Sequence, residues 1–420
     1  MKLCIFEDKK YDNLYPLTLT RAVFELRCGA TVLMDKIERS APNADVVYFM
    51  RDHLVAIFKE RYGERCVNEL NALKDDVLLV NGRLLAKTGD LSLEGDEEVA
   101  VKGEDIVYVR AKKETMEKLL ADSLEKTLEK LKGELSVKEV DATLIEYPWD
   151  LINNNSKAIV EDFKHIGSGI HGELHPQAVV VGDKENLYIA KTARVHPYTV
   201  IDVENGPVII DEGTIVYPFS RIEGPTYVGK NCWILRGNIR EGVSLGPVCR
   251  VGGEVEESII HGYSNKYHTG FLGHSYVGEW VNIGALTTNS DIKNDYTSVK
   301  VYIKGEFVDT KTQKVGSFIG DHTKFSIGCL LNTGSHIGVA CNLLASGEPL
   351  PKYIPSFCWY FRGRFSRGWG FRRTIKSESA MMARRKVEMT EARVKLLRRI
   401  YDETKEERET LIRMSRRRVR

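Results

Sequence analysis

A histidine in a glycine-rich stretch is the residue best suited to chemistry in this sequence. His268 stands within Asn265–His274, and Val281–Ala285, which reads Val-Asn-Ile-Gly-Ala, follows after a short interval. An imidazole whose pKa lies near neutrality takes a proton from an amine or a hydroxyl. His268 is therefore a candidate general base, and Asn282 is a candidate for orienting the group that accepts a transferred fragment. The Gly284-Ala285 step lets a flat ligand approach the backbone.

Two other interpretations of these histidines remain open. A single histidine is often a hydrogen-bonded structural residue, which would give His268 no chemical role. His261, His268 and His274 also resemble the three-histidine set of a zinc site, although their spacing is loose and no carboxylate partner stands out.

A six-residue repeat across residues 174–347 predicts the element that positions this segment. Glycine and β-branched residues are frequent there, and apolar residues recur at intervals of six. In such a repeat each unit forms one flat face of a triangular coil, its apolar residue points inward, and neighbouring coils bury one another's faces. We therefore predict a parallel β-helix, because a β-sandwich would alternate with period two. The repeating positions are Ile189 and Val195; Ile210, Val216 and Ile222; Val228 and Ile234; Leu245 and Val251; Val277 and Ile283.

The repeat is interrupted at His261–Thr269 and again at Asp291–Gln313. We expect insertions at both places, and insertions on one face of a solenoid usually build its binding surface.

The front of the chain alternates strand-like and helix-like segments, which favours an α/β layer with a parallel sheet. We expect strands at Lys2–Phe6, Val46–Met50 and Val77–Val80. We expect helices over Gly29–Arg39, Leu54–Arg61 and Lys112–Gly133. The first domain should span residues 1–165, the β-helix 166–360 and a basic helical extension 361–420.

Charge is distributed unevenly along the chain. Residues 361–420 hold 20 Lys and Arg against 8 Asp and Glu, which leaves 41 against 51 in the rest of the chain. Met381–Met414 has a helical composition, and Arg413–Arg420 is a basic cluster. Such a cluster can bind nucleic acid or acidic lipid, but no aromatic residues interleave with it. We favour a solvated helix on an acidic body and do not expect nucleic-acid binding.

Composition excludes several classes of protein. The eight cysteines are scattered without a C-x-x-C pair, which argues against a disulfide framework and favours a reducing cytoplasm. Glu7 and Asp8 precede any apolar signal segment. The uncharged stretch Ser326–Gly347 contains polar residues and reads poorly as a membrane span.

The repeat region resembles the acetyltransferase half of the bifunctional N-acetylglucosamine-1-phosphate uridylyltransferase/glucosamine-1-phosphate acetyltransferase family. The family pattern His-x-x-Tyr-Leu-Gly reads here as His268-Thr-Gly-Phe-Leu-Gly, followed at the family interval by Val281-Asn-Ile-Gly-Ala. The resemblance implies a left-handed β-helix. It makes His268 the base that deprotonates an amino sugar, Phe271 and Asn282 substrate-binding residues, and Ala285 and Cys329 contacts of coenzyme A.

The same resemblance assigns residues to the acceptor's phosphate. Arg240-Glu-Gly resembles a family Arg-Pro-Gly whose arginine grips the sugar phosphate, a role that suits a guanidinium. Lys293 or Lys300 would replace a further phosphate-binding lysine. Ser258 stands where the family has another lysine.

The front domain resembles a divergent, GlmU-like branch of Rossmann-like sugar-1-phosphate nucleotidyltransferases. Its usual glycine-rich loop is missing from the segment between Phe6 and Arg21, and Val80-Asn81-Gly82-Arg83 stands where the family has Gly-Asp-x-Pro. The resemblance implies nucleotide binding by Arg21, Asn81 and Gly82, with Mg²⁺ at Asp8. A solvated or structural role for Arg21 is the alternative.

Together these features predict a cytoplasmic enzyme with two sites. The front domain would join a sugar 1-phosphate to a nucleoside triphosphate, with Mg²⁺ neutralising phosphate charge. The β-helix would transfer an acetyl group from acetyl-CoA, which the resemblance places between the subunits of a homotrimer. A non-catalytic scaffold subunit and a protein with nucleotidyl transfer alone are the competing hypotheses.

Overall fold

The computed structural model describes residues 1–417, which form two compact units. The first unit comprises Met1–Leu14, Thr20–Leu26 and Thr31–Glu146, and the second comprises Tyr15–Leu19, Arg27–Ala30 and the described residues from 147 to 417. The last three residues of the predicted basic cluster, 418–420, lie outside the described residues.

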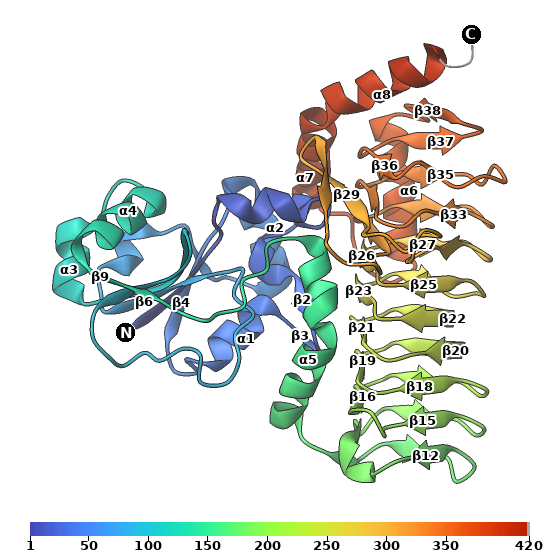
Figure 1. Cartoon of the computed structure of the whole chain (residues 1–420), viewed down its shortest axis with the longest axis horizontal. Coiled ribbons are helices and arrows are strands. Elements are labelled where there is room, and N and C mark those ends of the chain that lie inside the picture. The colour runs from blue at the N-terminus through green and yellow to red at the C-terminus, as the bar shows by residue number, and fades with distance from the viewer. Residues whose placement is uncertain (418–420) are drawn as a thin grey trace. The chain divides into compact units, whose positions relative to one another are not determined.

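The front unit is built on one seven-stranded sheet of order β5-β4-β1-β6-β8-β7-β9 (Figure 1). The first four strands in this order are parallel to one another, β8 is antiparallel to β6 and β7, and β9 is parallel to β7. The strands are β1 (Lys2–Phe6), β4 (Asp45–Phe49), β5 (Cys66–Val67), β6 (Val77–Asn81), β7 (Glu98–Lys102), β8 (Asp105–Ala111) and β9 (Ser136–Glu139), and the short β3 (Thr31–Val32) lies outside this sheet.

Helices accompany this sheet as the alternation predicted, but the expected helix Lys112–Gly133 is broken into two helices between Leu119 and Leu124. The helices of this unit are α1 (Leu33–Arg39), α2 (Val55–Tyr62), α3 (Lys113–Leu119) and α4 (Leu124–Glu134). The expected helix Gly29–Arg39 begins only at Leu33, because Thr31–Val32 is extended. The α/β class is thus confirmed, but the sheet is mixed: it is parallel from β5 to β6, and β8 runs antiparallel to both of its neighbours.

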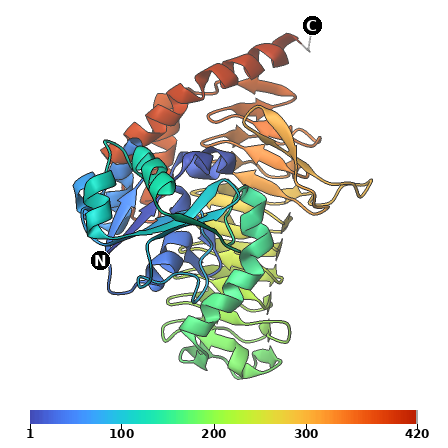
Figure 2. The same ribbon diagram turned by 60° about the vertical axis from the view of Figure 1, so that its left-hand side comes forward.

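The second unit is a parallel β-helix with three faces, which confirms the fold predicted from the repeat (Figures 1 and 2). The first face stacks β10 (Gly169–Ile170), β13 (Leu187–Ile189), β16 (Val208–Ile210), β19 (Thr226–Val228), β21 (Val243–Leu245), β23 (Ile259–Gly262), β26 (Tyr276–Glu279), β31 (Ser317–Ile319), β34 (Ser335–Ile337) and β36 (Tyr353–Ile354). The second face stacks β11 (Glu173–Leu174), β14 (Arg194–Val195), β17 (Ile215–Val216), β20 (Trp233–Ile239), β22 (Arg250–Glu256), β24 (Asn265–Lys266), β27 (Asn282–Ile283), β32 (Lys324–Phe325), β35 (Asn342–Leu343) and β37 (Trp359–Phe361), with β38 (Arg364–Ser366) closing it antiparallel. The third face holds β12 (Val179–Val181), β15 (Val200–Asp202), β18 (Arg221–Glu223), the later halves of β20 and β22, β25 (Phe271–Gly273), β28 (Thr288–Asn289) and β33 (Leu330–Leu331).

Apolar side chains align in register along the inside of each face. On the first face one ladder runs through Ile189, Ile210, Val228, Leu245, Ile260, Val277, Ile319, Ile337 and Ile354. None of these side chains is more than 1% exposed. Burying each one contributes about 1.5–3 kcal/mol relative to leaving it exposed, so the interior of the coil is the core of this unit.

The predicted insertion at His261–Thr269 is wrong. β23 and β24 keep this segment in the coil, and Lys266 pairs with Val251 on the second face. Because a lysine takes an inward position here, the apolar spacing does not reveal the repeat. The second interruption is confirmed, because Asp291–Gln313 leaves the coil as an antiparallel hairpin of β29 (Lys300–Ile303) and β30 (Glu306–Asp309), which projects from the coil in Figure 2.

Four helices pack on the β-helix within the second unit: α5 (Pro148–Ile166), α6 (Phe371–Ala383), α7 (Glu391–Glu403) and α8 (Lys405–Arg417). The Asn155 side chain of α5 donates to the Gly242 carbonyl and accepts from the Gly29 amide, next to β2 (Arg27–Cys28). At the other end, the buried Arg408 of α8 donates to the Ser356 carbonyl. The predicted helical tail is therefore folded onto the coil.

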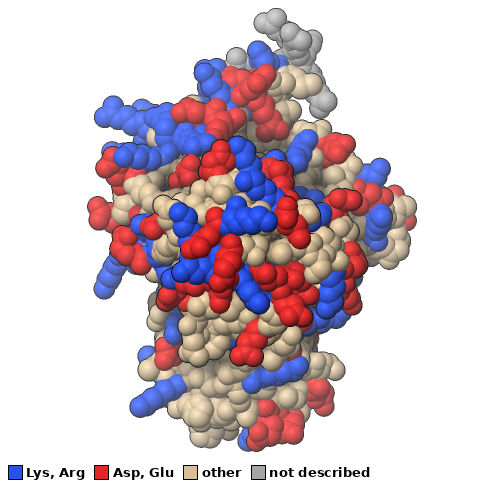
Figure 3. Space-filling view, turned by 90° about the vertical axis from the view of Figure 1, so that its left-hand side faces the viewer, with Lys and Arg blue, Asp and Glu red and all other residues tan. Residues whose placement is uncertain are grey.

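No helix within residues 1–417 is both long and apolar enough to cross a membrane. On the face shown in Figure 3, acidic and basic side chains are interspersed rather than segregated.

Candidate functional sites

The front unit has a cavity of about 720 Å³ at the carboxyl ends of its central parallel strands. Phe6 ends β1, Phe49 ends β4 and Asn81 ends β6, and all three line the cavity. β1 is the strand from which the chain order runs outward in two directions, and open α/β sheets bind ligands in the crevice at that point. The cavity is therefore the candidate ligand site of this unit.

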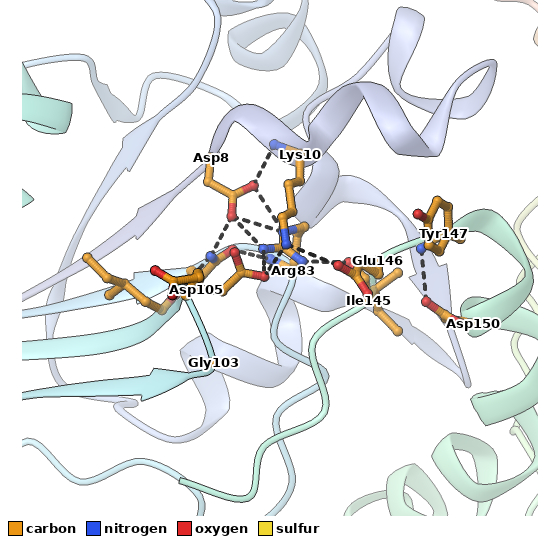
Figure 4. Close-up of polar contacts among 12 residues, drawn as sticks. Asp8, Lys10, Arg83, Gly103, Asp105, Ile145, Glu146, Tyr147 and Asp150 are labelled. Atoms are coloured by element: carbon orange, nitrogen blue, oxygen red, sulfur yellow. Dashed lines mark hydrogen bonds and ion pairs between the residues drawn. The ribbon is translucent and has the colours of Figure 1, made fainter. Parts of the chain in front are cut away.

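A cluster of ion pairs forms one wall of this cavity (Figure 4). The fully buried guanidinium of Arg83 contacts Asp8 at 2.6 Å and Asp105 at 2.9 Å, and the Lys10 amine contacts Asp105 at 2.8 Å and Glu146 at 3.0 Å. Burial favours the neutral form of Asp105, but Lys10 and Arg83 outweigh it and lower the pKa of that carboxyl. The cluster is charged and internally compensated.

The predicted nucleotide-binding residues occupy different environments. The Asn81 side chain lines the cavity and donates to Asp8 and to the Ile106 carbonyl. Gly82 donates its amide to the Phe6 carbonyl, and a Cβ there would meet the Phe24 ring at 2.8 Å, so close packing explains this glycine. Arg21 is fully buried and is not among the residues that line the cavity.

The carboxylates at this wall do not fit a divalent cation as they are arranged. Both oxygens of Asp8 already accept from Arg83, and one also accepts from Asn81. Mg²⁺ requires open oxygen ligands in near-octahedral geometry. Within residues 1–417 no group of three metal-ligating side chains comes together, and this holds for His261, His268 and His274 as well.

Saturation of Asp8 makes a direct prediction about metal binding. Titration of the full-length protein with Mn²⁺, followed by electron paramagnetic resonance, should show only weak, non-saturating binding, because Arg83 already neutralises the carboxylates. The Asp8→Asn variant should give the same titration. Stoichiometric Mn²⁺ binding that disappears in Asp8→Asn would contradict this account.

A second cavity, of about 660 Å³, opens at a corner of the β-helix around His268. The His268 side chain is exposed, Ala285 lies on the next coil, and Tyr267 meets the His268 ring edge to face at 5.2 Å. Arg236 also lines the cavity, and its guanidinium forms no ion pair with any described residue. The remaining lining is mostly apolar or aromatic: Tyr217, Pro218, Phe219, Leu235 and Leu286, with Gly253 and Thr269.

The structure brings His268 and Ala285 together but places other predicted residues elsewhere. Phe271 packs its ring against Gly273 on the third face and does not line the His268 cavity. The Cys329 thiol points into the coil, donates to the Leu343 carbonyl, and has a pKa raised by burial. The Lys293 amine contacts Asp295 and Thr297 within the hairpin insertion.

Glutamates surround the predicted phosphate-binding Arg240. Its guanidinium lies 2.8 Å from Glu256, 3.5 Å from Glu241 and 4.0 Å from Glu223. Burial lowers the pKa of this guanidinium, but the glutamates outweigh burial and raise it. Arg240 is therefore compensated within the chain and presents little positive charge to an added phosphate.

The most unusual residue near His268 is one that spacing did not reveal. The Lys266 side chain is 2% exposed, in line with Val251 on the inner ladder of the second face. Its amine donates to the carbonyls of Gly252 at 2.8 Å, His268 at 3.2 Å and Gly270 at 2.5 Å. Buried polar groups need such partners, so Lys266 ties the His268 corner to the coil from the inside.

Arg83 and Lys266 were not predicted as site residues, but each lies close in the sequence to a motif that was recognised. Arg83 stands within the Val80–Arg83 segment that the family comparison singles out, and Lys266 lies two positions before His268. Neither residue type predicts an internal role from sequence alone, because lysine and arginine are normally exposed.

Burial lowers the pKa of Lys266 to about 8, below the ordinary value of 10.5. Since the folded-state pKa is below the unfolded one, the unfolded chain binds more protons between these values, and stability due to this amine rises with pH there. Relative to Lys266→Met, the wild-type free energy of unfolding should rise by up to about 3 kcal/mol between pH 8 and 10.5. Denaturant unfolding at several pH values measures it.

The matched control is Lys191→Met at an exposed position of another coil of the β-helix. Its difference from the wild type should stay nearly constant over the same range. A constant difference for Lys266→Met as well would contradict a buried, perturbed amine.

Comparison with known proteins finds similarity to transferases over parts of the chain. Residues 3–170 match the family model described as sugar nucleotidyl transferase. A bifunctional sugar-1-phosphate nucleotidylyltransferase/acetyltransferase of Sulfurisphaera tokodaii is 36% identical over 85 residues, which are 20% of this chain and 21% of that protein. The bifunctional protein GlmU of Methanococcus aeolicus is 30% identical over 203 residues, 46% of this chain and 42% of that protein.

A solved structure of Francisella novicida UDP-N-acetylglucosamine acyltransferase is also similar, with 13% identity, coverage of 54% of this chain and 89% of that one, and a TM-score of 0.28. The family model and the two bifunctional relatives are all transferases, and the chain resembles them in part while its own fold joins an α/β unit to a β-helix. The chain resembles GlmU proteins over part of its length, as its motifs predicted. It spans only about a fifth to two fifths of the length of the curated relatives named above.

Proposed function

We propose that the β-helix unit transfers an acetyl group from acetyl-CoA to the amine of an amino sugar phosphate, with His268 as the general base. The observation that carries this proposal is the exposed His268 ring in a largely apolar cavity, beside Ala285 and the uncompensated Arg236. An apolar wall suits the acyl arm of the donor, and Arg236 supplies charge for a phosphate.

The proposed reaction needs one proton transfer at His268. As the amine nitrogen attacks the thioester carbonyl, His268 accepts a proton from that nitrogen, a C–N bond forms and the C–S bond breaks. The proton then passes to the departing thiolate, and the products are an N-acetyl sugar phosphate and coenzyme A. Lys266 fixes the backbone carbonyl of His268 and so limits movement of the base.

Nucleotidyl transfer is proposed for the front unit on the strength of its family match. Nucleoside triphosphate and sugar 1-phosphate would bind in the cavity at the ends of β1, β4 and β6. Because Arg83 and Lys10 already occupy the carboxylates there, ligand binding without transfer is a second candidate function for this unit. Pyrophosphate release with a panel of nucleotides distinguishes the two, since a binding scaffold releases none.

We also propose a homotrimer as the working form, in a reducing cytoplasm. His268 and Asn282 open to different cavities of one chain, which supports a site completed by a neighbouring copy. An apolar edge runs along the same corner, where large side chains are more than half exposed: Tyr198, Phe219, Leu286 and Ile327. All eight cysteines are free thiols, which fits a reducing compartment.

Replacing the base tests acetyl transfer directly. His268→Gln should reduce thiol release from acetyl-CoA in the presence of glucosamine 1-phosphate by about 100-fold or more. Its melting temperature should be unchanged, because the His268 side chain is exposed. His171→Gln, at an exposed histidine of the first coil, should retain full activity. Equal activity of His268→Gln and wild type would refute the proposed role.

Charge at the apolar edge tests the trimer. Ile327 is 70% exposed, and Ile327→Asp should convert a trimer to monomers when molar mass is measured by light scattering, because a carboxylate is costly to bury between copies. Val137→Asp, at a 50% exposed apolar residue of the front unit, should remain trimeric. A monomeric wild type would disprove the assembly.

A further inference from the structure

A third cavity, of about 340 Å³, lies between the second face of the β-helix and the helix α6 that packs on it. The β-helix contributes Asn265, Asn282 and Lys324, and an aromatic wall in which Tyr263 and Trp280 stack at 4.5 Å. The α6 end contributes Ser377, Ala380, Met381, Arg384 and Arg385. This places residues of the basic extension next to Asn282.

The arginines of this cavity carry charge that the protein does not compensate. Among the described residues, neither Arg384 nor Arg385 forms an ion pair, and Arg250, close to Arg385, forms none either. The pKa of Arg385 is lowered mainly by burial and secondly by repulsion from Arg384. The pKa of Arg250 is lowered mainly by burial and secondly by repulsion from Arg385. A bound anion would stabilise these neighbouring guanidinium groups, because it would supply the negative charge that the chain does not provide.

A chain of hydrogen bonds aims these groups at the cavity. Arg385 donates through Nη2 to the Asn265 Oδ1 atom at 2.9 Å, and Asn265 donates to the Asn282 Oδ1 atom at 3.3 Å. The Nε atom of Arg385 is buried and has no hydrogen-bond partner among the described residues. The Asn282 side-chain amide nitrogen, which donates no hydrogen bond to a described residue, therefore remains for a ligand.

The carboxylate that is bonded to the cavity-lining Lys324 does not compete for this charge. Glu378 of α6 is 2% exposed and is bonded to Lys324 and, at 3.1 Å, to His322 Nδ1. Burial raises the pKa of Glu378, but His322 and Lys324 outweigh burial and lower it, so the carboxylate is held by its own partners. The residues that line the cavity include no acid.

We propose that this cavity is a binding site for the phosphomonoester group of a small ligand, held by Arg384 and Arg385 of the C-terminal extension. Guanidinium groups match phosphate oxygens in geometry and charge. The volume is at the small end of ligand sites, which fits a phosphate with a compact polar body. Asparagine amides are suited to the hydroxyls of such a body.

This inference rests on the proposed acetyl transfer only for the identity of the ligand. Arg240, the arginine that the family comparison points to, is neutralised by glutamates, so a phosphate must find its cations elsewhere. Asn282 and Ala285 are three residues apart, and their Cα atoms are at most about 11 Å apart. The phosphate site therefore flanks the His268 cavity. Its ligand is the acceptor's phosphate or the 3′-phosphate of coenzyme A.

Calorimetric titration of the full-length protein with ligands that carry no acetyl group tests the site, because no acetyl transfer can occur during the measurement. Glucosamine 1-phosphate, coenzyme A and dephospho-coenzyme A, which lacks the 3′-phosphate, are titrated separately. At least one phosphomonoester should bind, and Arg385→Gln should weaken its affinity by about 10-fold or more. Binding of coenzyme A but not its dephospho form identifies the donor as the source, whereas binding of glucosamine 1-phosphate identifies the acceptor.

Two further variants keep the test independent of folding. Arg373→Gln, at an exposed arginine of α6 outside the cavity, should bind as the wild type does. Asn282→Asp keeps the side-chain size, adds negative charge and should weaken binding while the melting temperature stays within the range of the controls. Unchanged affinity in Arg385→Gln, an equal loss in Arg373→Gln, or no binding of any phosphomonoester would overturn the proposal.

The titration separates this site from the proposed enzyme activity. Arginine-dependent binding in a protein that transfers no acetyl group would refute the reaction and keep the site. Acetyl transfer with unchanged binding in Arg385→Gln would keep the reaction and refute the site.

Discussion

Register between successive coils is the constraint on which the rest of the β-helix unit depends. No single coil buries its own apolar side chains, and each inward residue is covered only by the residues above and below it. The ladder from Ile189 to Ile354 fixes every corner in turn, and with it the corner that carries His268. Lys266 interrupts the second ladder but satisfies its amine with three carbonyls of that corner. The site is thus held from inside the core.

Charge compensation inside the chain decides which cations remain for ligands. Arg83 is matched by Asp8 and Asp105, Arg240 by three glutamates, and Lys324 by Glu378. An acidic body that binds phosphorylated substrates needs cations without such partners. Arg236 at the His268 cavity and the arginine pair that follows α6 meet that condition, and the proposed phosphate site would give the basic extension a part in ligand binding.

Periodicity predicted the fold well because inward positions are almost all aliphatic. It failed only at His261–Thr269, where Lys266 takes an inward position. Hydrogen bonds from its amine to backbone carbonyls stabilise that position in place of the burial of an apolar side chain. The sites were harder to predict. His268 and Ala285 share a cavity because they lie on adjacent coils, but a motif cannot show that Cys329 faces inward, that Arg240 is surrounded by acids, or that α6 covers Asn282. Those facts depend on packing between segments far apart in the sequence.

The most direct test of the central claim is the mass of the product formed by the wild-type protein. Glucosamine 1-phosphate and acetyl-CoA labelled with carbon-13 in the acetyl group are incubated with the protein, and the sugar phosphate is analysed by mass spectrometry. The account predicts that the sugar phosphate gains one labelled acetyl group on its nitrogen, with one free thiol released for each. A sugar phosphate of unchanged mass, from protein that is folded and binds coenzyme A, would contradict it.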